Sequence, residues 1–138
     1  MVSIYSKTEP ENLLAIIQEF QDINKERINL TPAGECIQAA CKKLKNNVSF
    51  KAHRHNPLKR ETTMTQEAWV IIAGSIKAVF YDLDDSIICE KILKAGDCAV
   101  VFRAGHSFEV LEDNTLLYEF KNGPYYGVEL DKKFINEN

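Results

Sequence analysis

The chain contains no hydrophobic run of bilayer length, and its first residues lack the basic start, apolar stretch and small-residue cleavage site of a signal peptide. Positive charge is not in excess either, because 17 lysines and arginines stand against 20 acids and are scattered among them. Without a signal, a membrane segment or a basic stripe, we expect a cytoplasmic protein that binds neither membrane nor nucleic acid.

Closely spaced cysteine pairs are also missing. The chain has four cysteines, none of them in a CxxC spacing and all of them in apolar or alternating segments (Cys36, Cys41, Cys89 and Cys98). A cytosolic setting keeps thiols reduced, so we expect buried free thiols in preference to disulfides.

Helical signals occur only once, near the N-terminus. Thr8 can cap a helix, Pro10 suits its first turn, and apolar residues then recur at helical spacing (Leu13, Ile16, Ile17 and Phe20). These signals predict an amphipathic helix over residues 9–23, within an N-terminal helical extension that covers residues 1–26. The remaining residues, 27–138, fit a single domain in size.

Short strand-like runs separated by turn residues follow from residue 28 onward. They cover residues 28–31, 35–44, 48–55, 60–65, 67–73, 75–81, 86–93, 98–103, 106–111 and 115–121. No helix-length segment intervenes, which argues against a parallel βαβ architecture. The pattern predicts an all-β sandwich or barrel.

The histidines fall in or beside these runs. His53 and His55 stand at i and i+2 in a strand-like run, so their side chains project to one face and can reach one metal ion at about 2.0–2.1 Å. Exposed histidines on an edge strand would give the same pattern. Glu67 opens a strand-like run that ends in a glycine, and His106 opens another that follows a glycine corner.

This order of motifs resembles that of the cupin family, which has an HxH pair, a glutamate followed after six residues by a glycine, and then a glycine, a bend and a histidine. All histidines of the chain fall at ligand positions of that pattern. The resemblance implies a double-stranded β-helix, the jelly-roll barrel of cupins, around one divalent metal ion such as iron, nickel, manganese or zinc. The implied ligands are three histidines and a glutamate (His53, His55, Glu67 and His106). The ending Tyr118–Tyr125 is similar to that of small bacterial cupins found with surface-polysaccharide genes.

Two features depart from the cupin pattern. Eleven residues separate His55 from Glu67, where the family has about three or four, so Glu61 is an alternative ligand. Glu67 is favoured because it keeps the family's distance to the following glycine. The second motif has Phe102 in place of its usual proline and is one residue short before His106. A metal-free cupin whose histidines pack in the core is the alternative.

Further residues are candidates for the wall of a ligand pocket. Lys51 shares the inward face of a regular strand with His53, and Trp69 shares the face of Glu67. Four others are candidates for the pocket rim, the last two more weakly (Gln38, Tyr118, Arg54 and Lys121). For each of them an ordinary surface or packing role is the alternative.

The resulting hypothesis is a metalloenzyme that acts on a small polar molecule such as a sugar derivative, as an isomerase, epimerase or oxygenase. A noncatalytic module that binds a small molecule, and a structural or storage barrel with an incidental metal, are the alternatives. Because cupins commonly pair their barrels, we also expect a homodimer.

Overall fold

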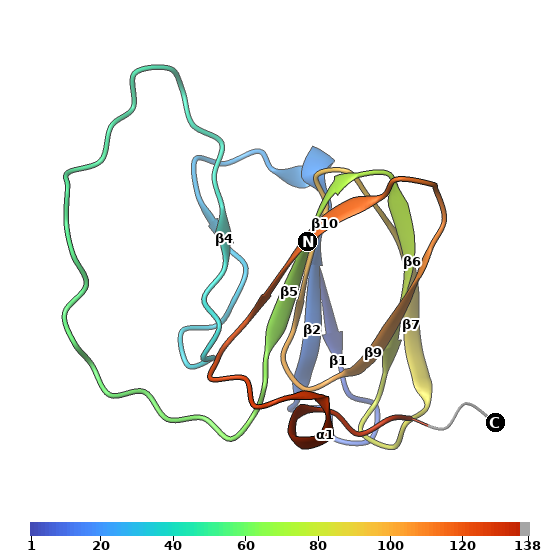
Figure 1. Cartoon of the computed structure of the whole chain (residues 1–138). Helices are drawn as coiled ribbons and strands as arrows, with labels where there is room; N and C mark the ends of the chain where they lie inside the picture. The colour runs from blue at the N-terminus through green and yellow to red at the C-terminus, as the bar shows by residue number, and fades with distance from the viewer. Residues whose placement is uncertain (136–138) are drawn as a thin grey trace.

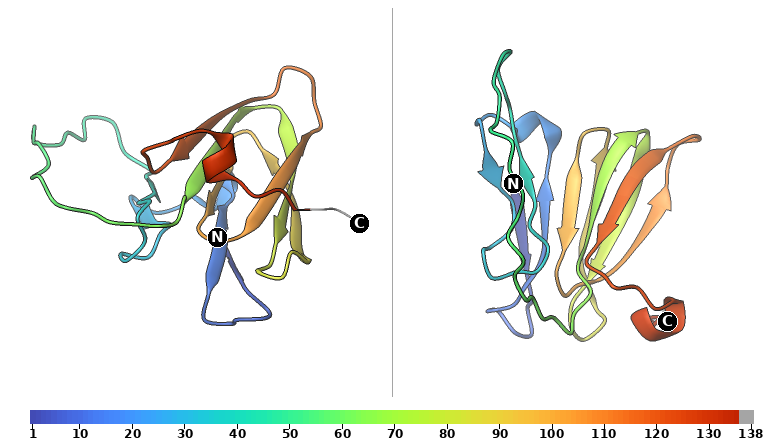
Figure 2. Two further views of the ribbon diagram at one scale, coloured as in Figure 1. Left: turned by 60° about the horizontal axis from the view of Figure 1, so that its bottom comes forward. Right: turned by 60° about the vertical axis from the view of Figure 1, so that its left-hand side comes forward.

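The computed structural model describes residues 1–135 and consists mainly of antiparallel β-strands (Figure 1 and Figure 2). Its largest sheet has five strands in the order β1-β2-β8-β5-β10, and a second sheet has three in the order β7-β6-β9. The predicted all-β class is therefore confirmed.

The five-stranded sheet contains strands from both ends of the chain. In spatial order they are β1 (Val2–Tyr5), β2 (Leu13–Gln18), β8 (Cys98–Val101), β5 (Glu67–Ala73) and β10 (Leu116–Lys121). The three-stranded sheet contains β6 (Ser75–Tyr81), β7 (Ile87–Lys94) and β9 (Gly105–Val110). The short strands β3 (Ile28–Asn29) and β4 (Ala40–Cys41) pair with each other. The helical elements described are η1 (Phe20–Asp22) and α1 (Val128–Asp131), and neither is long and apolar enough to span a membrane.

The six strands predicted between residues 67 and 121 are confirmed as β5 to β10, within two residues at each end. The pattern predicts them well because each is a short β-rich run bounded by turn residues. The turn between β5 and β6 requires a glycine, because Gly74 has a φ of 73° and an added Cβ would lie 2.2 Å from Oγ1 of Thr115.

The amphipathic helix predicted over residues 9–23 is wrong. Residues Leu13–Gln18 form β2, which lies between β1 and β8, and all six are buried. Leu14 and Ile17 belong to the core between the sheets, whereas Leu13 and Ile16 belong to a cluster on the other face. A strand covered on both faces has a continuous apolar run, which a helical spacing also fits by chance. Residues 2–18 are thus part of the main sheet and not a helical extension.

The main core lies between the two sheets and includes Trp69, Ile71, Phe80 and Leu93. A second cluster covers the opposite face of the five-stranded sheet, where Leu30 packs with residues of β2 and β8 and of the corner after β8. An ion pair of 2.8 Å between Nη1 of Arg103 and Oε1 of Glu35 ties residues 30–41 to that corner.

The segment between β4 and β5 leaves the sheets. Residues 42–65 are all exposed and contain no strand, so the strands predicted at 48–55 and 60–65 are not formed in this structure. The segment swings out as a wide loop, on the left of Figure 1 and in the left view of Figure 2. In the described part of the chain β9 pairs only with β6, and β10 pairs only with β5. The two sheets therefore form an open sandwich.

Candidate functional site

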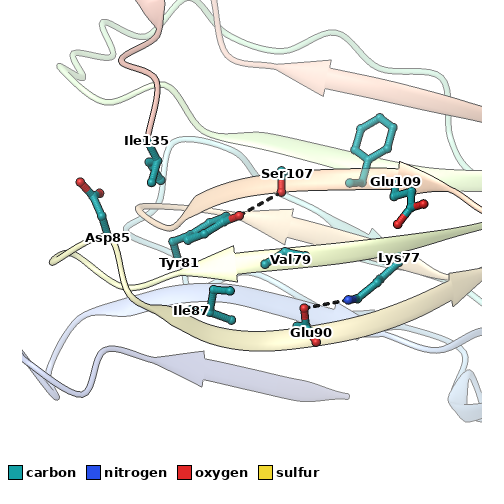
Figure 3. Close-up of a pocket in the computed structure, with 10 residues that line it drawn as sticks. Lys77, Val79, Tyr81, Asp85, Ile87, Glu90, Ser107, Glu109 and Ile135 are labelled. Atoms are coloured by element: carbon teal, nitrogen blue, oxygen red, sulfur yellow. Dashed lines mark hydrogen bonds and ion pairs between the residues drawn. The ribbon is translucent and has the colours of Figure 1, made fainter. Parts of the chain in front are cut away.

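Two cavities of about 640 Å³ each adjoin the three-stranded sheet. The first lies over the face of β6, β7 and β9 that carries Lys77, Tyr81 and Glu90 (Figure 3). Its lysine and glutamate neutralise each other through an ion pair of 2.8 Å between Nζ of Lys77 and Oε1 of Glu90. Both side chains are about half exposed, so an ion pair of this kind stabilises little.

The second cavity, which we name the Glu67 pocket, opens where β5 and β10 of one sheet face β9 of the other. Its wall includes Glu67 and Trp69 from β5, His106 and Phe108 from β9, and residues 130–135 of the C-terminal tail. The Trp69 ring packs edge-on against His106 and Phe108, with ring centroids 5.1 and 5.3 Å apart. Unlike the first cavity, this one has a buried charged residue in its wall, so it is the stronger candidate site.

Glu67 is buried, with 5% of its surface exposed, and three side chains donate hydrogen bonds to its carboxylate. Oε1 accepts from Nε1 of Trp69 at 3.0 Å and from Nε2 of His106 at 2.8 Å, while Oε2 accepts from Nζ of Lys121 at 3.0 Å. The strand pairing explains why Lys121 contacts Glu67, because Lys121 of β10 lies directly opposite Glu67 of β5. Trp69 is two residues further along β5 and therefore shares the face of Glu67.

These partners decide the charge of Glu67. Burial by itself would raise the pKa of Glu67, but the hydrogen bonds and positive charges of His106 and Lys121 outweigh burial and hold that pKa at about 2. Burial would likewise lower the pKa of Lys121, whereas its hydrogen bonds to Glu67 and Glu119 raise it above the usual value. The site therefore holds a carboxylate and an ammonium group together at neutral pH.

His106 connects this buried pair to the cavity. Its Nε2 faces Glu67, and its Nδ1 lies 3.3 Å from the carbonyl oxygen of Ala104. Both ring nitrogens thus lie within hydrogen-bonding distance of an oxygen acceptor. About a quarter of the side chain, 26%, stays accessible, so a bound molecule can touch it.

The structure brings two of the four predicted metal ligands together and leaves the other two apart from them. Glu67 and His106 meet in the pocket. His53 and His55 lie in the exposed segment, with ring centroids 5.5 Å apart, and Nδ1 of His53 lies 2.9 Å from the carbonyl oxygen of Lys51. The alternative ligand, Glu61, forms an exposed ion pair of 2.6 Å with Lys59.

As arranged, these residues do not fit a divalent metal ion. Residues 1–135 hold no group of three or more His, Cys, Asp or Glu side chains placed to bind one. Glu67 and His106 offer two donors, already bonded to each other, and Lys121 places a positive charge beside the carboxylate. A metal centre would need further ligands and a place for that charge.

Only some of the residues predicted to line the pocket do so. Trp69 lines the pocket beside Glu67, and Lys121, a weaker candidate, contacts the carboxylate. Lys51, Gln38 and Tyr118 are not in the pocket wall. Lys51 is exposed in the loop, Tyr118 is 62% exposed on β10, and Nε2 of Gln38 donates to the carbonyl oxygens of Pro32 and Glu35. Arg54 lies in the exposed segment.

Sequence reasoning missed the residues that the strand edges and the tail contribute. Glu119 lines the pocket and lies 3.1 Å from Lys121, and Lys132 and Lys133 line it from the tail. Glu119 could have been found, since it lies two residues from Lys121 on one strand and therefore shares its face. Lys132 and Lys133 lie in an irregular tail, whose sequence has no periodic pattern that would predict their position. Comparison of the chain with protein families, with curated proteins and with solved structures gives no match.

Proposed function

We propose that the protein binds a small polar molecule in the Glu67 pocket. The observation that carries the proposal is the buried Glu67 carboxylate, whose oxygens accept from Trp69, His106 and Lys121 beside an open cavity of about 640 Å³. A cavity of this size suits a small ligand, and buried ionised groups beside a cavity are typical of binding and catalytic sites.

Proton transfer is the chemistry that the described residues offer. Glu67 orients the His106 ring through Nε2, and a bound hydroxyl or carbonyl group that replaces one of the ring's contacts can exchange a proton with it. Proton exchange at a substrate oxygen is one part of the isomerisation or epimerisation of a sugar derivative, which the resemblance to polysaccharide-linked cupins suggests. In a noncatalytic module, the same groups would bind the ligand without turnover.

The proposal is tested by thermal unfolding against a panel of neutral sugars, sugar acids and sugar phosphates. A ligand of the pocket should raise the Tm of the wild type but not that of Glu67→Gln or His106→Asn. The matched control is Glu90→Gln, because Glu90 pairs with a lysine in the other cavity and should respond as the wild type does. A panel that stabilises none of the proteins, or all four equally, contradicts the proposal. NMR of the stabilising compound then separates an enzyme from a binding module, since only an enzyme changes it.

A second candidate is the metal-dependent cupin function predicted from the sequence. One observation favours it: the edge of β9 beside the pocket pairs with no other strand among residues 1–135, and the exposed residues 48–55 have the alternation of a strand. Extended chain spans about 3.3–3.6 Å per residue, so the link between His55 and Glu67 can reach β9. Pairing there would close the jelly roll and bring His53 and His55 toward Glu67 and His106.

Elemental analysis tests this candidate, using protein purified without chelator or nickel resin. The expected result is a stoichiometric transition metal in the wild type that is lost both in His106→Ala and in the double variant His53→Ala/His55→Ala. The two changes lie in different parts of the chain, so a shared site alone accounts for a shared loss. Equal metal contents in all three proteins, or none in the wild type, would rule the candidate out.

A further inference from the structure

We infer that the ligand of the Glu67 pocket carries an oxyanion, either a phosphate or a carboxylate, and that Lys132 and Lys133 bind this group at the mouth of the pocket. The inference rests on the proposed function and adds to it the chemical class of the ligand.

The nitrogen groups deeper in the pocket already have carboxylate partners. Lys121 binds both Glu67 and Glu119, at 3.0 and 3.1 Å, and His106 binds Glu67 at 2.8 Å. Arg103, which also lines the pocket, has its guanidinium against Glu35 at 2.8 Å. Each of these groups already contacts a protein carboxylate, so the inner pocket offers no uncompensated positive charge to an anion.

The two lysines of the tail differ from these groups. Lys132 and Lys133 are exposed, line the pocket and form no ion pair within residues 1–135. The residue before them is fixed, because Oδ1 of Asp131 accepts a hydrogen bond of 2.7 Å from Oγ1 of Thr65 on another part of the pocket wall. This bond holds residue 131 against the pocket wall, next to Lys132 and Lys133.

The distribution of charge along the chain also favours an anionic ligand. Residues 42–61 contain seven lysines and arginines and one acid, Glu61, in a protein whose net charge is −3. Every one of these residues is exposed, and the segment leads directly into Thr63, Met64 and Thr65, which line the pocket. An acidic protein thus concentrates positive charge on the segment that leads into the pocket, and such a field attracts anionic ligands.

The inner and outer parts of the pocket therefore suit different chemical groups. Glu67 and His106 can bind hydroxyl groups, and the Trp69 and Phe108 rings supply an apolar wall. The mouth offers two ammonium groups to an oxyanion, with which charged hydrogen bonds are about twice as strong as neutral ones. A small hydroxylated molecule with one anionic group satisfies both ends.

Trp69 makes this inference directly measurable, because it is the single tryptophan of the chain and lines the pocket. Its fluorescence would be followed while sodium phosphate, sodium acetate or neutral glucose is added at constant ionic strength. The test variant is Lys132→Ala/Lys133→Ala. The matched control is Lys7→Ala/Lys25→Ala, two exposed lysines outside residues 42–61 whose replacement removes the same charge and which do not line the pocket.

We expect phosphate or acetate to give a saturable change whose half-saturation concentration rises roughly tenfold in the tail variant and less than about twofold in the control. The anion that saturates the signal at the lower concentration shows whether the bound group is a phosphate or a carboxylate. If glucose saturates the signal and neither anion does, the inference fails while the proposed function stands. If no probe saturates it, or if both double variants weaken anion binding equally, the inference fails as well.

Discussion

Glu67 accepts hydrogen bonds from His106 and Lys121, and its removal would leave both without their common partner. Breaking a buried ion pair costs more than the pair contributes, because the remaining charge stays desolvated. His106 and Lys121 keep 26% and 19% of their side chains accessible, which limits that penalty.

We therefore expect Glu67→Gln to lower the free energy of unfolding by about 2–3 kcal/mol, measured by urea denaturation at pH 7. Glu119→Gln is the matched control, since Glu119 contacts the same lysine but is 41% exposed, and it should cost less than about 1 kcal/mol. Similar losses in the two variants would show that burial of Glu67 has no energetic consequence.

The low pKa of Glu67 makes part of the stability depend on pH. The folded pKa, about 2, lies below the ordinary value of 4.5, so the unfolded state binds the proton first. The stabilising contribution is fully present above pH 4.5 and is lost as the pH falls toward 2.

Urea denaturation between pH 6 and pH 3 should show a decrease in the free energy of unfolding that is smaller in Glu67→Gln by about 2 kcal/mol. Other carboxylates titrate in both proteins, so the difference between the two curves isolates Glu67. Parallel curves would contradict the low pKa.

At the scale of single elements, the strands that the sequence predicts well are the short β-rich runs bounded by turn residues. Residues 67–121 contain six such runs, separated by turns such as those at Gly74 and at residues 82–85, and form β5 to β10. β2 does not alternate, because it is covered by the core on one face and by Leu30 and its neighbours on the other, and its apolar run fits a helix equally well. Long-range pairing with β1 and β8 decides between the two, and local spacing contains no information about it.

The sequence predicts only some residues of the candidate site. Glu67 and His106 could be predicted, because each lies at the start of a β-rich run in a recognisable order of motifs. The partner of Glu67 across the sheet, Lys121, depends on the register between β5 and β10 and was only a weak candidate. Lys132 and Lys133 depend on the path of an irregular tail, and the net charge of −3 masks the concentration of basic residues at 42–61.

The exposed segment can be tested as an element by limited trypsin digestion. Its lysines and arginines are all exposed, so cleavage should begin between residues 42 and 60, and both fragments should stay associated because β2 and β8 pair across the cut. Arg103, held by Glu35, is an internal control that should resist. A segment as resistant as Arg103 would mean that residues 48–55 form a strand after all.

At the scale of the whole molecule, one edge strand of each main sheet, β10 and β9, lies beside the pocket. The predicted homodimer stays a prediction, and apolar side chains exposed on β5 and β10 are candidates for its contact (Ile72, Leu116, Tyr118 and Phe120). Light scattering at micromolar concentration should give twice the monomer mass of 15.7 kDa, and Phe120→Glu should reduce it. A wild type with the monomer mass would contradict the expected homodimer.

The central claim is that β5, β9 and β10 meet around the Glu67 carboxylate, and the indole N–H of Trp69 reports on it most directly. The chain has one tryptophan, so an NMR spectrum of ¹⁵N-labelled protein contains one indole N–H signal. Because this N–H donates to buried Glu67 at 3.0 Å, its exchange with solvent should be slow, and the signal should shift in Glu67→Gln and His106→Asn but not in Glu90→Gln. A signal that exchanges rapidly and is unmoved by the first two substitutions would contradict the account.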